Sequence, residues 1–110
     1  MNFQHKELAQ GRWSQMSIVE QLGNVGSEVS RAINWKAKNN LANSHQAFFR
    51  ALELLDLTIS DKKNISRLKE IVRVREVLSD FFMGNNQFNS TDNSWQKYFS
   101  YFAIAARKNY

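Results

Sequence analysis

Apolar residues recur at the three- and four-residue spacing of amphipathic α-helices in four stretches of this chain. The stretches cover about residues 18–38, 45–60, 65–83 and 94–107, and short segments rich in Asn, Ser, Asp and Gly separate them. In each stretch the spacing gathers apolar side chains on one side of the helix. The pattern predicts an all-α fold, a compact bundle of four helices.

Residues that favour helix ends stand close to the expected boundaries. Ser17 and Glu20 form a capping-box pattern ahead of the first helix, because each side chain can accept a hydrogen bond from a free amide there. Asn43 or Ser44 is expected to cap the second helix. Gly84 is expected to end the third helix in the left-handed conformation.

Composition limits both the domain organisation and the chemistry. The chain has 110 residues with four Gly, two His, no Pro and no Cys. Without Cys, and with so few His, it offers little support for a disulfide framework, a thiolate or His metal site, or a nucleophilic triad. We expect a loosely ordered N-terminal arm in residues 1–16 and a helical bundle domain in residues 17–110. Phe3 and Trp13 are the arm residues that could dock on the bundle.

Two glycines, Gly23 and Gly26, interrupt the first helix. Gly inside a helix costs about 0.5–1 kcal/mol relative to Ala, so a compensating contact is expected. Gly26 lies within the apolar stripe, where it would let a neighbouring helix approach closely. The G-x-x-G spacing also occurs in loops that grip nucleic-acid backbones, but such a loop needs a turn, and the helical period continues through this segment. We therefore predict that the glycines serve packing.

The second and third helices carry unusual apolar surfaces. The second is apolar around most of its circumference, which indicates either a central helix or a homodimer contact. The apolar face expected for the third helix has Arg75 in its middle and is formed by Leu68, Ile71, Val72, Leu78 and Phe82. An unpaired buried guanidinium is very costly, so Arg75 must either pair with a carboxylate or reach a cavity. We expect an ion pair, with Glu28, Glu53 and Asp56 as the available acids.

The positive charge of the chain is concentrated in one segment. The formal net charge is +5, and residues 62–75 hold six Lys or Arg and one acid. The rest of the chain then has nine basic and nine acidic residues, so the whole excess of positive charge lies in this segment. Such a stripe attracts phosphate in a sequence-independent, salt-sensitive way, although the same pattern also occurs on ordinary solvated faces. We predict a non-catalytic binding module that contacts RNA or DNA phosphates. The predicted contact residues are Lys62, Lys63, Arg67, Lys69 and Arg73.

Four acids form a second pattern with chemical potential. Glu53 and Asp56 lie one turn apart in the second helix, and Glu76 and Asp80 lie one turn apart in the third. The string E-x-x-D…E-x-x-x-D resembles the E-x-x-E…E-x-x-x-D motif of MazG-type all-α nucleotide pyrophosphohydrolases, with Asp56 as the departure. The resemblance implies that these carboxylates bind Mg²⁺ over a nucleoside triphosphate. A magnesium-dependent pyrophosphohydrolase is therefore the alternative function. If the protein is not such an enzyme, no cofactor is expected.

Longer strings also carry a resemblance. EQLGNVGSEVSRAINWK, RALELLDLTISD, RLKEIVRVREV, and WQKYF followed by AAR are similar to a family of small uncharacterised helical proteins of bacteria and archaea. That resemblance implies one compact domain and a prokaryotic source, but no function. No signal-peptide pattern or membrane-length apolar run is present, so a cytoplasmic location without membrane contact is expected. A structural or adaptor subunit with a protein partner is the third function class.

Overall fold

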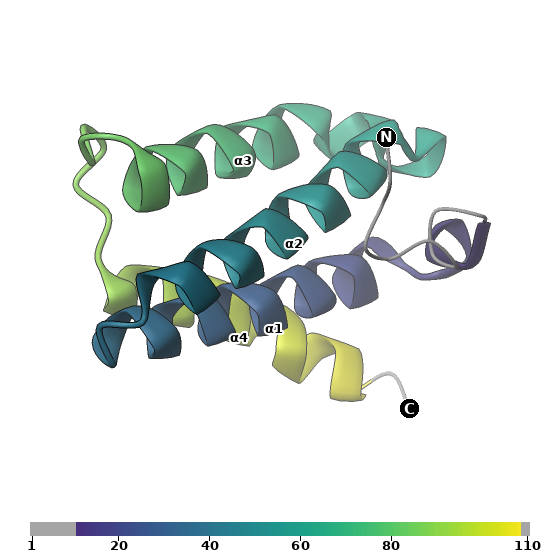
Figure 1. Cartoon of the computed structure of the whole chain (residues 1–110). Helices are drawn as coiled ribbons and strands as arrows, with labels where there is room; N and C mark the ends of the chain where they lie inside the picture. The colour runs from purple at the N-terminus through teal and green to yellow at the C-terminus, as the bar shows by residue number, and fades with distance from the viewer. Residues whose placement is uncertain (1–10, 109–110) are drawn as a thin grey trace.

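The structure, a computed structural model, describes residues 11–108, and these residues form an all-α bundle of four helices (Figure 1). The helices are α1 (Ile18–Ala37), α2 (Leu41–Ser60), α3 (Leu68–Met83) and α4 (Asp92–Lys108). Two short 3-10 segments, η2 (Trp13–Gln15) and η3 (Lys62–Arg67), precede α1 and α3. Each helix runs opposite to the helix before it (Figure 1). The predicted fold class is therefore confirmed.

α1 and α2 are the central helices of the bundle. α1 packs against both α2 and α4, and α2 packs against both α1 and α3. This position explains why α2 is apolar on several sides: Phe48 and Leu55 are fully buried, and Leu54 is 2 % exposed. The homodimer remains a prediction. Within the described residues, no helix combines the length and apolar character needed to cross a lipid bilayer.

The N-terminal ends of α1 and α2 differ in how well the sequence predicted them. The capping box of α1 is confirmed, since Ser17 Oγ accepts from the Glu20 amide and Glu20 Oε1 accepts from the Ser17 amide, both at 3.1 Å. The predicted cap of α2 is wrong. Asn40 caps the helix by accepting from the Asn43 amide at 3.1 Å, while the buried Ser44 hydroxyl donates to the Ala32 carbonyl at 2.8 Å. Ser44 thus serves the contact between α1 and α2.

The third helix departs from the prediction at both ends. Residues 62–67 form η3, so the regular α-helical register begins only at Leu68 and not near residue 65, the expected start. Gly84 ends α3, but its φ of −106° is not left-handed. The left-handed positions of this loop are Asn86 and Asn89, with φ of 53° and 55°. A side chain at residue 84 would instead meet the Asp80 carbonyl oxygen, 3.0 Å from the added Cβ.

Trp13 docks on the bundle, as the sequence suggested. Its ring is 2 % exposed, and its indole N–H donates to Thr58 Oγ1 at 3.1 Å. Its carbonyl oxygen accepts from Gln21 Nε2 at 2.8 Å, so the segment is tied to both α1 and α2. The packed bundle therefore begins before residue 17, the expected boundary. Phe3 lies outside the described residues.

The packing role predicted for the glycines is confirmed at Gly26. A Cβ added there would lie 2.7 Å from Phe99 Cβ, closer than real Cβ atoms approach other atoms. A Cβ added at Gly23 would have its nearest neighbour, the Phe102 carbonyl oxygen, at 3.8 Å. Gly26 is thus required by the contact between α1 and α4, whereas Gly23 only borders it.

Candidate functional site

Three of the five predicted phosphate-binding residues are exposed along η3 and α3, and we call them the cationic face. Lys62, Lys69 and Arg73 are exposed, and within residues 11–108 neither lysine has an acidic partner. The nearest acid to Arg73 is Glu76, 3.9 Å away, and both side chains are more than half exposed. An ion pair of this kind contributes little free energy, so Arg73 keeps most of its attraction for an anion.

The other two predicted residues are paired with acids of their own segment. Lys63 Nζ contacts the Asp61 carboxylate and donates to the Ser14 carbonyl oxygen at 2.8 Å. Arg67 binds one Glu70 oxygen through Nε at 3.0 Å and through a terminal nitrogen at 2.6 Å. These pairs largely neutralise both cations. The structure therefore separates Lys63 and Arg67 from the cationic face.

Beneath Lys63, buried polar side chains anchor η3. Asn64 Nδ2 donates to Gln21 Oε1 at 2.8 Å and to the Thr58 carbonyl at 3.0 Å, and Gln21 Nε2 donates to Asp61 Oδ2 at 2.9 Å. Burial alone would raise the pKa of Asp61, but hydrogen bonds from Lys63 and Gln21 outweigh it and hold the pKa below its usual value. A buried network with its partners in place is rigid. η3 is consequently fixed to α1 and α2.

Glu70 joins α3 to α4. One of its oxygens binds Arg67, and the other accepts from the Tyr98 hydroxyl at 3.1 Å. Burial, together with the negative charge of Glu70, raises the pKa of Tyr98, so the hydroxyl keeps its proton and remains a donor. The Arg67 guanidinium also lies 5.9 Å from the ring centre of Phe102. Long polar side chains therefore span the space between these two helices.

The apolar face predicted for α3 is wrong at Leu68 and Val72, which are 36 % and 44 % exposed. The side chains of α3 that enter the core are Ile71, Val74 and Leu78. Their three- and four-residue spacing turns α3 so that Leu68 and Val72 face outward next to Lys69. Ile65 of η3 is 75 % exposed. Ile65, Leu68 and Val72 thus form an aliphatic strip beside the cationic face.

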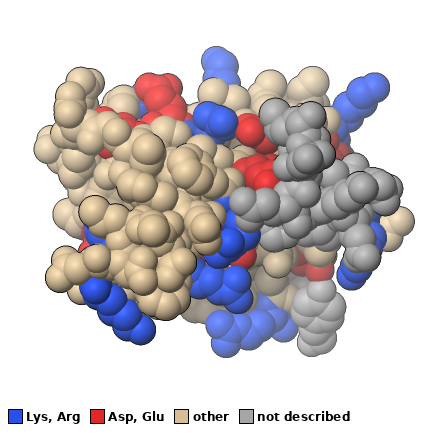
Figure 2. All heavy atoms as spheres, viewed as in Figure 1, with Lys and Arg blue, Asp and Glu red and all other residues tan. Residues whose placement is uncertain are grey.

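Positive charge is spread over two edges of the molecule. In Figure 2, Lys and Arg side chains project from the upper edge, where η3 and α3 lie, and from the lower edge, where α1 and α4 lie. The cations of α1, of its C-cap and of α4 include Arg31, Lys36, Lys38, Lys97, Arg107 and Lys108. Positive charge therefore occurs on the surface well away from the segment that carries the excess in the sequence. A test of the cationic face needs a control variant on the lower edge.

The structure does not gather the acids predicted to bind magnesium. Within residues 11–108, no group of three or more His, Asp or Glu side chains is placed to hold a metal ion. Asp56 instead accepts from Arg75 Nε at 2.7 Å and from a terminal nitrogen at 3.4 Å, as the ion-pair prediction for Arg75 required. Glu53 is half-buried on α2, and Glu76 is exposed on α3.

Asp80, the fourth predicted ligand, closes the loop after α3. Its two oxygens accept from the amides of Gln87 and Phe88 at 2.9 and 3.1 Å. This arrangement places the Phe88 ring under the Arg73 guanidinium, 4.5 Å from the ring centre. A cation over an aromatic ring is attracted to its π face. Asp80 and Phe88 therefore help to position a residue of the cationic face.

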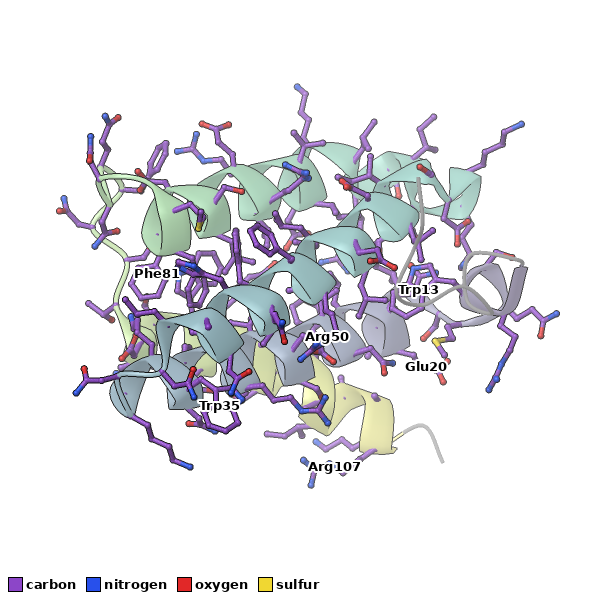
Figure 3. The ribbon with its side chains drawn as sticks, viewed as in Figure 1. Trp13, Glu20, Trp35, Arg50, Phe81 and Arg107 are labelled. Atoms are coloured by element: carbon purple, nitrogen blue, oxygen red, sulfur yellow. The ribbon has the colours of Figure 1, made fainter. Side chains whose placement is uncertain are left out.

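Sequence reasoning missed a more deeply buried ion pair. Glu28 of α1 is 7 % exposed and binds Arg50 Nε of α2 at 3.0 Å and Arg31 at 3.2 Å. Arg50 is labelled in Figure 3. The available signal was its helical position, because residue 28 falls between Val25 and Ala32 on the buried side of α1. Glu28 therefore joins α1 to α2 and is not the partner of the arginine in α3.

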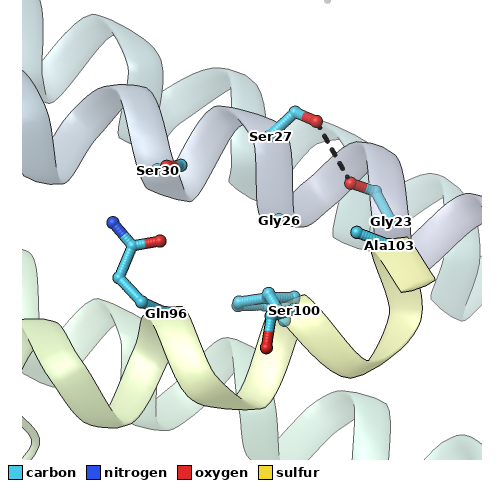
Figure 4. A pocket seen from close by; sticks show the side chains of 8 residues that line it. Gly23, Gly26, Ser27, Ser30, Gln96, Ser100 and Ala103 are labelled. Atoms are coloured by element: carbon cyan, nitrogen blue, oxygen red, sulfur yellow. Dashed lines mark hydrogen bonds between the residues drawn. The ribbon is translucent and has the colours of Figure 1, made fainter.

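A groove of small residues runs between α1 and α4 (Figure 4). Two adjoining hollows of about 230 and 310 Å³ share Gly23, Ser27 and Ala103. The Ser27 hydroxyl donates to the Gly23 carbonyl at 3.3 Å, so it is already bonded within its own helix. The groove follows from the small residues that permit close helix contact.

A separate cavity lies between α3 and α4, whose backbones approach each other little. This cleft, of about 240 Å³, is lined by Arg73, Val74 and Val77 from α3, by Ser90 from the loop before α4, and by Ser94, Trp95 and Tyr98 from α4. Trp95 is 7 % exposed, and its indole nitrogen has no hydrogen-bond partner among the described residues. A buried donor without an acceptor costs about 1–3 kcal/mol, and such groups are uncommon in folded proteins.

In comparisons with known proteins, no family model, no curated protein and no solved structure matches this chain. The resemblances stated for the sequence strings and for the acidic pattern therefore remain predictions. Any functional conclusion must come from the geometry of the chain itself.

Proposed function

We propose that this protein is a non-catalytic binding module that holds phosphate groups of RNA or DNA on its cationic face. The observation that carries the proposal is the state of Lys62, Lys69 and Arg73. All three are exposed, and neither lysine has an acidic partner within residues 11–108. Cations of this kind bind phosphate by releasing condensed counterions from the nucleic acid.

The contacts that hold the residues of the cationic face in place favour a binding site over an ordinary solvated surface. η3 is fixed by the buried polar cluster, and Arg73 is held over Phe88. A cation that is already positioned loses less conformational entropy when it meets a phosphate. The number of cations also sets the expected salt dependence of binding. For a nucleic-acid duplex, a plot of the logarithm of the binding constant against the logarithm of salt concentration should have a slope of about −3. We therefore expect weak, sequence-tolerant binding.

A salt series with duplex and single-stranded RNA tests the proposal. Each of Lys62→Gln, Lys69→Gln and Arg73→Gln should weaken binding and reduce the slope by about one. The matched control is Lys38→Gln, which removes an exposed cation from the C-terminal end of α1 on the opposite edge and should leave the slope unchanged. Binding that does not depend on salt, or an equal loss in Lys38→Gln, would contradict the proposal.

The aliphatic strip supports a second candidate, an adaptor that binds an acidic amphipathic protein segment. Ile65 and Val72 would meet the apolar side of such a segment, and the adjacent Lys69 would meet its acids. Ile65→Ser separates the two candidates, because it should weaken binding of an acidic helix and leave RNA binding nearly unchanged. The magnesium-dependent pyrophosphohydrolase has no metal-binding group behind it within residues 11–108. A pyrophosphate assay with Mg²⁺ and mixed triphosphates tests it in the same preparations.

A further inference from the structure

Central packing explains the buried side chains of α2, but it leaves two large apolar residues in the N-terminal half of this helix on the surface. Leu41 is 57 % exposed and Phe49 is 46 % exposed. Residues 41, 45 and 49 lie about one helical turn apart, so His45 stands between the other two on the same side of α2. The His45 and Phe49 rings lie 6.4 Å apart.

The fold places the C-terminal end of α3 beside these residues. α2 and α3 run antiparallel, so the start of one helix lies at the same end of the bundle as the end of the other (Figure 1). Ring contacts connect them there, because Phe48 lies 5.5 Å from Phe49 and 5.0 Å from Phe82 of α3. Met83, the next residue, is 54 % exposed. We call this surface the uncharged patch and define it by Leu41, His45, Phe49, Phe82 and Met83.

Both segments that form this end of the molecule lack charged residues. Residues 39–49 and 81–91 contain no Asp, Glu, Lys or Arg. In Figure 2, the left part of the visible face, where these helix ends lie, correspondingly carries few charged side chains. Lys36 reaches this end from α1, but it lies 4.1 Å from the ring centre of Phe81 and is paired with Asp92 at 2.7 Å. In a chain of net charge +5, a second copy can therefore approach the patch without placing like charges opposite each other.

The polar side chains of the same two segments also suit a second copy. Five of these residues are exposed and carry carboxamides that make no hydrogen bond within residues 11–108: Asn39, Gln46, Asn85, Gln87 and Asn89. A carboxamide both donates and accepts hydrogen bonds, so the same group on a facing copy can satisfy it. In a two-fold symmetric contact each surface meets itself, and such groups are compatible with that symmetry whereas charged groups of one sign are not.

We propose that this protein forms a two-fold symmetric homodimer through the uncharged patch. Phe49 and Met83 of each chain supply the apolar centre of the contact, and the carboxamides form its polar rim, which is the usual organisation of a protein interface. Neither segment offers a Lys or Arg to a phosphate or to an acidic partner, so the patch and the cationic face have different occupants. A contact of this small size gives weak association, in the micromolar range.

Sedimentation equilibrium from low micromolar to millimolar protein tests the proposal. The average mass should rise with concentration from that of one chain towards twice that value. Because two copies of net charge +5 repel each other, added salt should strengthen dimerisation, whereas it should weaken nucleic-acid binding. Failure of this proposal can thus be told apart from failure of the proposed function. A monomer at every concentration and salt condition would overturn the homodimer and leave the patch to a different protein.

Three arginine variants locate the contact. Phe49→Arg and Met83→Arg should each weaken dimerisation on the order of a hundredfold, because the contact would bring two added guanidinium groups together. Ile104→Arg is the matched control: it adds the same charge at a residue that is 52 % exposed on α4, and it should change dimerisation far less. Thermal unfolding shows that each variant is folded. A dimer that survives both patch variants, or that Ile104→Arg weakens equally, would overturn the assignment of the patch.

Methionine methyl groups report the contact in the wild-type protein. In NMR spectra of protein labelled with ¹³C at these methyl groups, the Met83→Leu and Met16→Leu variants assign two of the signals. The Met83 signal should move as the protein is diluted from dimer to monomer. The Met16 signal should stay in place, because Met16 precedes α1 at the opposite end of the bundle (Figure 1). An unmoved Met83 signal in a protein that dimerises would place the contact elsewhere and overturn the proposal.

Discussion

The two faces of α4 meet their neighbouring helices in opposite ways. Toward α1, Phe99 lies so close to Gly26 that even one added carbon would overlap it. Toward α3, Trp95 and Tyr98 border an open cleft, and the Tyr98–Glu70 hydrogen bond is made by long side chains. One helix thus contributes a close-packed contact on one face and an unfilled cleft on the other.

The difference follows from the size of the residues that α4 meets. α1 presents Gly23 and Gly26, which let the helix backbones approach closely. α3 presents Glu70 and Arg73, and η3 presents Arg67 beside them; their charged groups need partners or solvent and therefore keep the backbones apart. Residue size at the contact, rather than the apolar character of α4, decides which face of α4 is close-packed and which borders a cleft.

The largest expected effect comes from removing the ring that fills the close-packed side. Phe99→Ala should lower the free energy of unfolding by about 3–5 kcal/mol, because Phe99 is 4 % exposed and its removal leaves a cavity. Val77→Ala, on the cleft side, should cost only about 1 kcal/mol, since its side chain already borders open space. Urea unfolding measures both. Equal losses would show that the two faces are packed alike.

A smaller effect, with a change of sign, separates the two glycines. Gly26→Ala should destabilise the protein by about 1–3 kcal/mol, because the new methyl group overlaps Phe99. Gly23→Ala should stabilise it by about 0.5–1 kcal/mol, because the methyl group has room and Ala favours the helix. The two variants control for each other in thermal and urea unfolding. Stabilisation in both would mean that α1 and α4 are not in close contact.

The smallest effect concerns the polar bridge across the cleft. Tyr98→Phe should cost about 1 kcal/mol near neutral pH by removing the bond to Glu70. Because the pKa of Tyr98 is raised in the folded state, the unfolded chain loses this proton first, above about pH 10. The free energy of unfolding of the wild-type protein should therefore fall as pH rises beyond that value. The difference in stability between the wild-type protein and Tyr98→Phe should shrink.

Tyr101→Phe is the matched control for this pH series. Tyr101 is 65 % exposed on the same helix, so its replacement should leave the pH dependence of unfolding close to that of the wild-type protein. The prediction fails if wild-type and Tyr98→Phe stability stay parallel between about pH 8 and 11.

The sequence predicted the helices because their apolar period is strong and Pro is absent. It predicted the close contact at Gly26 because a glycine inside an apolar stripe weakens the helix unless a neighbouring element packs against it. It failed where tertiary contacts override local preference. Ser44 resembles a cap but is used to bind the Ala32 carbonyl, and Leu68 resembles a core residue although the register of α3 turns it to solvent.

The candidate sites were predictable only in part. Exposure of Lys62 and Lys69 follows from their position in a charged segment. The pairing of Lys63 with the nearby Asp61 is local, but its second bond, to the Ser14 carbonyl 49 residues away, is not. The cleft had no signal in the sequence at all. It depends on the distance between α3 and α4, which no residue pattern encodes.

The short connection between α1 and α2 has a consequence for the order of folding. Only residues 38–40 separate the two helices, and Asn39 makes the turn with a φ of 59°. Contacts between α1 and α2 therefore close a short loop, whereas α4 reaches α1 only after two intervening helices, at a larger cost in chain entropy. We expect the α1–α2 hairpin to form in the folding transition state and α4 to dock afterwards.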